Sequence, residues 1–520
     1  MSIKLSYSNQ ALKGKLFINS AIGYVNSNED FWNRRLNERT YQVFTHGLFM
    51  VNYLSDSYLQ TNDERYIDLA TYYLNNWLVT HHKSKLVWHE TSVALRLTNI
   101  LKYINALYSK SDVPIYLTEL IVNHIEFLLD DENYRENNHG IMMDSRLASA
   151  INSLPVSIND YSSLIIKKVK ERSRLAIDRD FSSTGLHLEN SPDYHRLTVN
   201  WLSDIQENLI LQDDTLGKEY VEKLKRAKEI EAIVAMPNNR YPILGDSSSG
   251  TFIGQKNYED FVDKEAGRVI YHNEDLKSQL TFISGYGSKG HKQFDDLSFI
   301  FFDGNEVVFN DSGKYNYDLK DPIRKHMISP LAHNSLSLYK ENYTVSNNMK
   351  AKEAVFINHT KSHKYYKLVQ GVNNSYPNLK LVRTLIYFYD NTLLIYDDFS
   401  STNQNTIAVN FNLGLGVRAK RNSLTEYSLI GKGTKYILKS YDDRMTSVLL
   451  DDSNYHVCGI SDSFNKIKKN QRILFRKKTR EGSFLTSITQ ENSDFNVNSF
   501  ENRTLDLTLN NINLKISIDK

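Results

Sequence analysis

Three short polar clusters carry the side chains of this chain that are best suited to proton transfer. They are residues 137–140 (Asn-Asn-His-Gly), 191–196 (Ser-Pro-Asp-Tyr-His-Arg) and 291–298 (His-Lys-Gln-Phe-Asp-Asp-Leu-Ser). An amide can donate to a developing oxyanion, and a phenol or an imidazole can carry a proton. Apolar periodic segments separate the clusters over about 160 residues, which is typical of a site assembled from distant parts of a fold. We therefore expect an enzyme.

His291 and Tyr194 are the candidate proton carriers. An imidazole has an ordinary pKa of about 6.5 and can hold or release a proton at working pH. A phenol has a pKa of about 10, so nearby cations must perturb it before it accepts a proton near neutrality. His195 and Arg196 are close enough in sequence to do this. A purely structural alternative stays open, in which Tyr194 packs in the first turn of a helix.

The first cluster also has a structural alternative. Asn-Asn-His-Gly suits a left-handed turn that caps the C-terminus of a helix, with Gly140 supplying the positive φ. In the functional interpretation, the Asn138 amide donates to a substrate oxygen and His139 assists it. Both interpretations are compatible with these four residues seen alone.

The first half of the chain, from about residue 30 to 235, has apolar residues at helical spacing. Residues 61–64 (Thr-Asn-Asp-Glu) have the form of a capping box. One buried face is predicted after it, formed by Tyr66, Leu69, Ala70, Tyr73, Leu74 and Trp77. Another helix is predicted to begin at Ser191-Pro192. Short polar loops between successive helices predict helical hairpins around a common core.

After residues 242–250 the apolar period changes to about two residues, which predicts strands. Asp390-Asn391 and Asn510-Asn511 each separate two such runs and predict hairpins. The second half therefore predicts an antiparallel sheet with one buried face per strand, most simply a sandwich. The Gly/Ser stretch at 245–250 is the expected linker, so the predicted domains are 1–245 and 246–520.

Composition narrows the class of protein. The chain has 520 residues, 40% of them hydrophobic and 24% charged, which is typical of a soluble protein of two or three domains. A net charge of +2 gives no general field to attract nucleic acid. Cys458 is the only cysteine, which excludes an intrachain disulfide and a cysteine-based metal site. No run of about 18 apolar residues and no signal-peptide pattern occurs, so we expect a cytoplasmic protein without a membrane span.

In their order and spacing, the clusters resemble those of the heparinase II/III-like polysaccharide lyases. The resemblance extends over about residues 60–400 and includes residues 88–90 (Trp-His-Glu), Arg96, 310–313 (Asn-Asp-Ser-Gly) and 332–335 (Ala-His-Asn-Ser). It implies an α+β multidomain fold, with an N-terminal incomplete (α/α) toroid followed by a C-terminal antiparallel β-sandwich. It also implies a cleft that binds an acidic polysaccharide, which is cleaved beside a uronic acid by β-elimination.

The resemblance gives each candidate residue a role. Asn138 would stabilise the uronate carboxylate, while Tyr194, as base or proton shuttle, and His291, as general acid or base, would move the protons. Tyr315 and Tyr317 are weaker candidates for the acid that protonates O4. The residues implied in sugar binding or orientation are His89, Arg96, His139, His195, Arg196, Tyr315 and Tyr317.

Two departures from the family pattern are visible. Where relatives hold a metal, usually zinc, the positions read Gln293, Asp311 and His333, and glutamine is a poor zinc ligand. A weak divalent site for zinc or calcium, or a metal-free hydrogen-bonded cluster that braces the strand of His291, both remain open. Ile328 also replaces a family arginine, a role that Arg324 or Lys325 could take over.

We therefore expect a bacterial lyase acting on a uronate polymer or oligosaccharide and linked to capsule or exopolysaccharide production. The alternative is a carbohydrate-binding or scaffold protein of polysaccharide biosynthesis that has lost catalysis, suggested by Gln293 and Ile328. Because the proton-transfer residues themselves are retained, the enzyme is favoured. The sequence specifies neither the sugar and its linkage nor the mode of cleavage and the oligomeric state.

Overall fold

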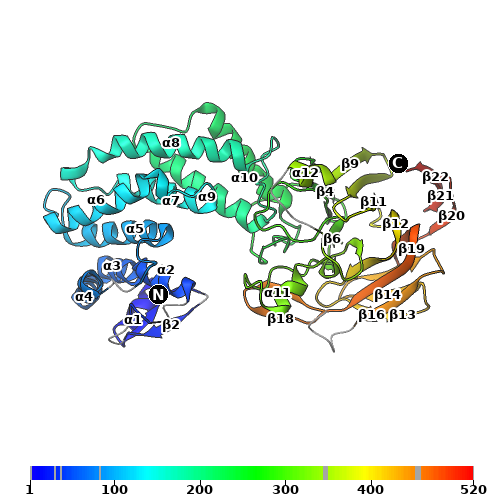
Figure 1. Cartoon of the computed structure of the whole chain (residues 1–520), viewed down its shortest axis with the longest axis horizontal. Helices are drawn as coiled ribbons and strands as arrows, with labels where there is room; N and C mark the ends of the chain where they lie inside the picture. The colour runs from blue at the N-terminus through cyan, green and yellow to red at the C-terminus, as the bar shows by residue number, and fades with distance from the viewer. Residues whose placement is uncertain are drawn as a thin grey trace. The chain divides into compact units, whose positions relative to one another are not determined.

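The computed structural model describes residues 3–20, 22–27, 31–34, 38–80, 84–343, 349–450 and 458–518 (Figure 1). Its backbone forms two compact units. Unit 1 comprises Met1–Asp180 and Leu197–Lys225, and unit 2 comprises Phe181–Arg196 and Arg226–Lys520. The boundary expected at residue 245 lies inside unit 2, where Asp246 and Ser247 are buried.

Unit 1 is built from helices, as the apolar periodicity predicts, and they pack as a series of neighbouring pairs (Figure 1). α3 packs against α4 and α5, α5 against α6 and α7, and α7 against α8. The elements that lie wholly in this unit are α1 (Ile3–Ala11), β1 (Lys15–Phe17), β2 (Tyr24–Asn26), α2 (Arg39–His46), α3 (Phe49–Thr61), α4 (Glu64–Thr80), α5 (Glu90–Leu107), α6 (Ile115–Leu129), η2 (Asp131–Asn133), α7 (Asn138–Ile151), η3 (Val156–Ile158) and α8 (Tyr161–Asp180). α9 (Pro192–Ile210) and α10 (Lys218–Val234) contribute residues to both units. The predicted helical half is confirmed.

The start of α4 differs from the prediction. Thr61 is the last residue of α3, and Asn62 follows it with a left-handed φ of 56°. The Asp63 side chain, not that of Thr61, accepts a hydrogen bond from the backbone N–H of Arg65 at 3.1 Å. The predicted capping box is therefore wrong, because Asn tolerates the left-handed turn that ends one helix immediately before the next.

Unit 2 is an antiparallel β-sandwich, as predicted (Figure 1). The smaller sheet has the order β3-β4-β5-β6-β7, and the larger sheet runs β13-β14-β15-β19-β12-β11-β10-β9 with β8 and β16 added beside β12 and β19. The first set of bounds is β3 (Phe261–Asp263), β4 (Arg268–Asn273), β5 (Ser278–Ile283), β6 (Ser298–Phe302), β7 (Val307–Phe309), β8 (Leu336–Leu338), β9 (Val355–Ser362) and β10 (Tyr366–Asn373). The second set is β11 (Leu379–Phe388), β12 (Leu393–Asn412), β13 (Arg418–Arg421), β14 (Glu426–Ile430), β15 (Lys435–Ser440), β16 (Thr446–Leu450) and β19 (Arg472–Gln490).

The core of unit 2 lies between the two sheets. Phe282 and Phe299 of the smaller sheet share one buried cluster with Leu385, Ile395 and Phe475 of the larger sheet. Both inner faces are apolar, so burial of this surface drives their packing. The C-terminal end of α10 covers part of the outer face of the smaller sheet, where Ile233 packs with residues of β3 and β4.

Both predicted hairpins are confirmed. β11 pairs with β12 across the turn that contains Asn391, and β21 (Thr504–Leu509) pairs with β22 (Ile512–Ser517) across Asn510-Asn511. All three asparagines have positive φ, which explains their type. β20 (Phe495–Glu501) joins the second hairpin to form a third layer, whose leucines pack on the outer face of the larger sheet. The remaining elements of unit 2 are β17 (Ile460–Ser463), β18 (Lys466–Lys468), α11 (Pro322–Met327), η4 (Pro330–Ala332) and α12 (Met349–Ala354).

Candidate active site

His291 lies in the loop that joins β5 to β6, and its backbone is left-handed with a φ of 54°. Such a conformation costs energy for a residue other than glycine and persists only where neighbours hold it. The side-chain amide of Asn190 holds the preceding loop by donating to the carbonyls of Ser288 and Gly290, each at 2.9 Å. The glycine-rich run before His291 is thus anchored.

Two carboxylates flank the His291 imidazole, whose side chain is 20% exposed. Nδ1 lies 3.1 Å from Oδ2 of Asp246, and Nε2 lies 3.7 Å from Oε2 of Glu189. Burial alone would raise the pKa of the Asp246 carboxyl, but hydrogen bonding to His291 and the charge of Arg324 outweigh it and lower the pKa. Asp246 is therefore an acceptor, and His291 donates to it from Nδ1–H.

The backbone next to Asp246 is fixed by close packing. A Cβ on Gly245, whose φ is 52°, would lie 2.5 Å from the carbonyl oxygen of Asn190. Only glycine fits this approach. Oγ of Ser247 lies 2.7 Å from Oγ of Ser191, and the backbone N–H of Ser248 donates to Asp193 at 2.8 Å. The 245–248 segment is thereby tied to the start of α9.

Tyr194 lies in the first turn of α9, which begins where the Ser191-Pro192 signal predicts. Ser191 caps the helix, because its Oγ accepts from the Tyr194 backbone N–H at 3.4 Å. The Tyr194 ring stacks on the His291 imidazole, with centroids 3.5 Å apart and planes 17° apart. The Tyr194 and Tyr317 hydroxyls lie 3.1 Å apart. The two predicted proton carriers are therefore in contact.

The electrostatics of Tyr194 differ from the expectation that cations perturb it. Burial, followed by the neighbouring Tyr317, Asp246 and Glu189, raises its pKa. The phenol is therefore protonated at neutral pH. In this state it can donate a proton, whereas accepting one would require ionisation that its carboxylate neighbours oppose.

His195 and Arg196 do not supply the expected cations at the Tyr194 hydroxyl. His195 is buried, its Nδ1 accepts from the His187 backbone N–H at 3.1 Å, and its Nε2–H donates to the Ala227 carbonyl at 2.8 Å. Burial lowers its pKa to about 4, so the ring is neutral. Arg196 lies 3.9 Å from the Asp193 carboxylate. These side chains hold the start of α9 in place.

Of the two tyrosines after residue 313, the structure brings Tyr317 to the proton carriers. Tyr317 is 48% exposed, faces the His291 ring edge-on at 6.2 Å, and its hydroxyl lies 3.5 Å from Nζ of Lys314. Tyr315 has a left-handed φ of 61°, and its carbonyl accepts from the Asn465 backbone N–H at 2.8 Å. Tyr315 therefore supports the loop through its backbone.

Asn138 is the first residue of α7 in unit 1, and Asn137 is its N-cap, accepting from the His139 backbone N–H at 2.9 Å. The C-cap alternative is therefore wrong. Gly140 lies within the helix, where a Cβ would come 2.0 Å from the Arg135 carbonyl oxygen. This position requires glycine for space, not for a positive φ. Among the described residues, the half-buried Asn138 amide has no side-chain hydrogen bond, which leaves it available to a ligand.

An open pocket of about 380 Å³ in unit 1 is lined by both sequence neighbours of Asn138, but not by Asn138 itself. Its lining residues are Arg39, His89, Glu90, Arg135, Asn137 and His139. His89 caps α5, and its Nε2 lies 2.6 Å from the Arg39 guanidinium. Burial disfavours ionisation of Glu90, but hydrogen bonding to His139 at 3.3 Å helps to lower its pKa to about 2. The two arginines and two imidazoles suit an anionic group, and Glu90 limits how much negative charge fits.

Arg96 does not line this pocket. It is fully buried, and its guanidinium donates to Nε2 of His124 at 2.7 Å and to the carbonyls of His46 and Val87 at 2.8 and 3.0 Å. It also lies 4.4 Å from the centroid of the Trp77 ring. These contacts join α2, α5 and α6, so Arg96 is a core residue of the helical unit.

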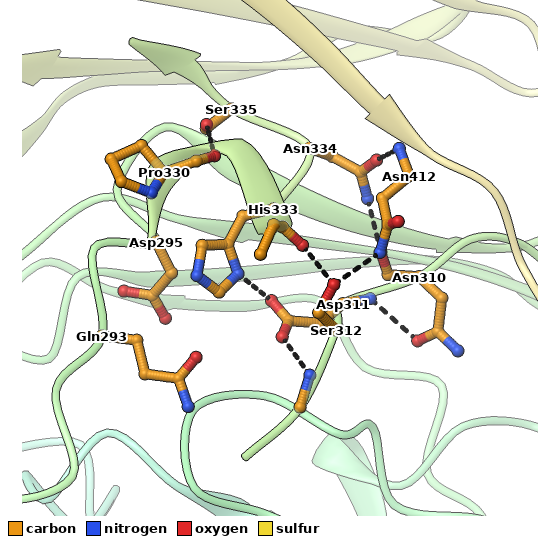
Figure 2. Close-up of polar contacts among 12 residues, drawn as sticks. Gln293, Asp295, Asn310, Asp311, Ser312, Pro330, His333, Asn334, Ser335 and Asn412 are labelled. Carbon is orange, nitrogen blue, oxygen red and sulfur yellow. Dashed lines mark hydrogen bonds and ion pairs between the residues drawn. The ribbon is translucent and has the colours of Figure 1, made fainter. Parts of the chain in front are cut away.

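The three positions that correspond to metal ligands in relatives, Gln293, Asp311 and His333, lie in a buried polar cluster (Figure 2). Nδ1 of His333 lies 2.8 Å from Oδ2 of Asp311, and Figure 2 shows the opposite side of the ring turned toward Asp295 and Gln293. Gln293 donates from Nε2 to Oδ1 of Asp246 at 2.8 Å. Within the described part of the chain, Nε2 of His333 and Oε1 of Gln293 have no hydrogen-bond partner.

This set does not fit a zinc site. Zinc prefers three or four nitrogen, sulfur or carboxylate donors, and the set supplies one free imidazole nitrogen, one amide oxygen and an aspartate already hydrogen-bonded at both oxygens. Over the described ranges, no group of three or more His, Cys, Asp or Glu side chains is arranged to hold an ion. The lysine at 292 supplies positive charge instead, since its buried ammonium lies 2.8 Å from both Asp295 and Asp296.

Two family models match the sequence. The model described as heparinase II/III N-terminus matches residues 7–266, and the model described as heparinase II/III-like, C-terminal, matches residues 264–495. The chain belongs to the heparinase II/III-like family of polysaccharide lyases. The predicted resemblance is confirmed.

Relatives of known structure share the fold of this family member. A heparinase III superposes with a TM-score of 0.79 at 16% identity, covering 99% of this chain and 91% of that one. The heparan sulfate lyase HepC from Pedobacter heparinus superposes with a TM-score of 0.73 at 16% identity, covering 100% and 89%. A heparin-sulfate lyase of Bacteroides thetaiotaomicron is 21% identical over 70% of this chain and 60% of its own length.

No described helix is long and apolar enough to cross a membrane.

Arg324 and Lys325 are the residues expected to take over the role of the family arginine that Ile328 replaces. Arg324 is buried and binds Asp246, with NH1 2.8 Å from Oδ1 and NH2 3.1 Å from Oδ2. It therefore does not take over a substrate-binding role from Ile328. Lys325 is exposed, and within the part of the chain that the structure describes no side-chain interaction places it at the candidate site.

Sequence reasoning missed several residues of the candidate site. Asp246 and Glu189 face His291, and Arg39, Arg135 and Glu90 line the unit 1 pocket. The sequence predicts a linker at the Gly-Asp-Ser-Ser-Ser run, whereas the structure buries Asp246 of this run against His291; its acidic residue is the available signal. Arg39 and Arg135 had no such signal, because isolated surface arginines are common.

Proposed function

We propose that this chain is a polysaccharide lyase that cleaves beside a uronic acid by β-elimination. The observation that carries the proposal is the contact between His291, backed by Asp246, and the protonated phenol of Tyr194. Membership of a lyase family and relatives named as lyases of heparan sulfate and heparin-sulfate support an acidic polysaccharide as substrate.

His291 is the proposed base. Its Nδ1–H donates to Asp246, so the lone pair of the neutral ring is on Nε2. Nε2 removes the C5 proton of the uronate, the electrons of that C–H bond form the C4=C5 double bond, and the C4–O4 bond breaks. Glu189, 3.7 Å from Nε2, stabilises the imidazolium that results.

Tyr194 is the proposed acid. Its raised pKa keeps the hydroxyl protonated, and the departing O4 takes this proton as the glycosidic bond breaks. The hydroxyl of Tyr317, 3.1 Å away and itself beside Lys314, provides a path by which solvent returns a proton to the phenolate. Acid and base are thus assigned to two groups that touch each other.

Asn138 is proposed to bind the C6 carboxylate. The C5 proton is only weakly acidic, and an amide donor to the carboxylate oxygens stabilises the enolate that forms when it leaves. The adjacent pocket, with Arg39, His89, Arg135 and His139, would bind acidic groups of the sugar. The proposal requires one uronate residue to reach Asn138 of unit 1 and His291 of unit 2 together.

No metal takes part in this proposal, because the donor set of Gln293, Asp311 and His333 does not fit one. We further propose that the polymer is a capsule or exopolysaccharide of the bacterium itself and that the enzyme acts in the cytoplasm. Fractionation of cells, followed by detection of the protein, tests the location. The alternative function, called the rival below, is a protein that binds carbohydrate but has lost catalysis.

Incubation with a panel of uronate polymers tests the function. The panel includes heparan sulfate, alginate and the capsule of the source bacterium, and ultraviolet absorbance reports the 4,5-unsaturated product. The expected result is product from at least one polymer, with mass spectrometry showing no added water at the new non-reducing end. Binding of a polymer without any product supports the rival, and hydrolytic ends would contradict β-elimination.

A further inference from the structure

The Asp246 carboxylate is held from several sides inside unit 2. Its Oδ1 accepts a hydrogen bond from Nε2 of Gln293 at 2.8 Å and forms an ion pair with NH1 of Arg324 at 2.8 Å. Its Oδ2 accepts from NH2 of Arg324 and from Nδ1 of His291, both at 3.1 Å. The side chain is 4% exposed, so water does not compete for these oxygens. The carboxylate makes these three hydrogen bonds and the ion pair to NH1 of Arg324 together in this one orientation.

The orientation of the Gln293 amide follows from chemistry. A carboxylate accepts hydrogen bonds and cannot donate, so the Gln293 group facing Asp246 is its NH₂. The Gln293 side chain is buried, so water does not replace Asp246 as the acceptor of its NH₂ group. An apolar residue of the same size would leave Oδ1 with Arg324 alone.

The hydrogen bond to Asp246 determines which ring nitrogen of His291 carries the proton. With Nδ1–H directed to Oδ2, the neutral ring has its lone pair on Nε2, the nitrogen that faces away from Asp246. If Asp246 turned, the other tautomer would place a hydrogen on Nε2 and remove the base from the proposed reaction. In serine proteases, loss of the equivalent carboxylate lowers kcat by about 10⁴ through this change of tautomer.

We propose that Asp246 and Gln293 are positioning residues for His291, Asp246 by setting the Nδ1–H tautomer and Gln293 by fixing Asp246. This inference rests on the proposed function for its catalytic meaning, but its structural part is independent. Gln293 thereby has a role other than metal binding. Its side-chain NH₂ donates the hydrogen bond that holds Asp246.

Nitrogen-15 NMR of histidine-labelled full-length protein tests the structural part, because the ring-nitrogen shifts distinguish the two neutral tautomers. One pH at which the ring is neutral is used throughout, and a His291→Gln variant identifies the signal. We expect Nδ1–H in the wild type, predominantly Nε2–H in Asp246→Asn, and a mixture in Gln293→Met. Gln279→Met is the matched control, because Gln279 is equally buried but contacts Val234, Thr281 and His272; it should leave the His291 signal unchanged, although the His272 signal can respond.

Kinetics on the polymer selected by the panel tests the catalytic part. Asp246→Asn should lower kcat by about 10³- to 10⁴-fold and Gln293→Met by about 10-fold, both with little change in KM. Gln293→Glu keeps the shape of the side chain but loses the hydrogen-bond donor, so its fall in kcat should equal or exceed that of Gln293→Met. It replaces that variant if Gln293→Met does not fold.

An Nε2–H tautomer in the wild type would overturn the inference, as would an Nδ1–H tautomer that survives in Asp246→Asn, Gln293→Met and Gln293→Glu. If the tautomer shifts as expected but no polymer yields product, the positioning contacts stand and the proposed function fails. If product forms but kcat does not respond to these variants, the proposed function stands and the inference fails.

Discussion

The imidazole of His291 lies against the phenol of Tyr194, with ring centroids 3.5 Å apart and planes 17° apart. The residues are 97 positions apart in the sequence, and their contact depends on the interlocked segments at 189–196, 245–248 and 288–293. The stack fixes both rings without using either Oη of Tyr194 or Nε2 of His291. Packing therefore holds both rings, while the Tyr194 hydroxyl contacts the Tyr317 hydroxyl and Nε2 of His291 faces Glu189.

Tyr194→Phe should therefore separate packing from chemistry. The ring stack survives, but the proton for O4 is lost, so kcat should fall by about 10²- to 10⁴-fold with little change in KM or thermal midpoint. Initial rates on the selected polymer and a melting curve measure these quantities. Tyr315→Phe is the control and should retain activity. Equal loss in both variants would contradict the assignment of the acid to Tyr194.

Asn137 and Asn138 provide a matched pair at the start of α7. Asn138→Ala should lower kcat by about 10²- to 10³-fold, because it removes a donor to the developing enolate. Asn137→Ala removes the N-cap and should instead cost about 1 kcal/mol of stability while keeping most activity. Rates and urea unfolding distinguish the two effects. Loss of activity in Asn137→Ala alone would remove Asn138 from the site.

The buried Asp144 should make the stability of unit 1 depend on pH. Burial raises its pKa to about 7, although Arg172 and Tyr134 oppose the shift. Because the unfolded pKa is about 3.9, the protonated carboxyl contributes stability that is complete below that pH and is lost as pH rises to about 7. The loss amounts to about 4 kcal/mol, at about 1.4 kcal/mol per pH unit.

Asp144→Asn cannot titrate, so its stability relative to the wild type should improve between pH 4 and pH 8. Urea unfolding at both pH values measures this difference directly. Tyr134, which donates to Asp144 at 3.0 Å, links the network to the turn before Asn138. Parallel pH profiles for the two proteins would show that Asp144 is ionised throughout.

Arg383 and Asp397 form a buried bidentate pair, with N–O distances of 2.7 and 2.8 Å. Arg383 also donates to the carbonyl of Leu297 at 2.8 Å, so it holds the end of the His291 loop. Arg383→Met leaves a buried charge without a partner and should cost about 3–5 kcal/mol of unfolding free energy. The double variant Arg383→Met/Asp397→Leu should recover much of it. A double variant less stable than the single one would contradict this account.

A chelator should leave the wild type unchanged in activity and thermal midpoint, since Gln293 does not complete a zinc site. Gln293→His supplies the imidazole that the family pattern has at this position, on the side of the His333 ring where the unpartnered Nε2 and Asp295 lie (Figure 2). Zinc should therefore raise the melting temperature of this variant, by an amount equivalent to about 2.7 kcal/mol at 100 times the Kd. Loss of wild-type stability on chelation would show that a metal is bound after all.

The helical first half and the β-sandwich second half could both be predicted from the sequence, because each has its own periodic pattern of apolar residues. The α4 stripe, the start of α9 at Ser191-Pro192 and the hairpins at Asn391 and Asn510-Asn511 all rest on local chemistry. Local signals were ambiguous where the same residue type is common at both the start and the end of a helix. Thr61 ends α3 instead of capping α4. Asn137 caps the start of α7, although the Asn-Asn-His-Gly sequence is equally compatible with the end of a helix.

Side-chain environment was the part that the sequence did not reveal. Arg96 and His195 are polar residues in recognised motifs, yet each is buried and holds backbone carbonyls. Their helical positions alone do not distinguish a core-facing residue from a pocket-facing one. Asp246 reaches His291 only through long-range packing around Gly245, which no local pattern specifies.

The most direct test of the central claim is the experimental structure of the Tyr194→Phe protein with a bound uronate oligosaccharide. We predict that one uronate ring has its carboxylate within hydrogen-bonding distance of the Asn138 amide and its C5 facing Nε2 of His291. A ring that contacts only one of these two residues, at saturating ligand, would contradict the proposed β-elimination site.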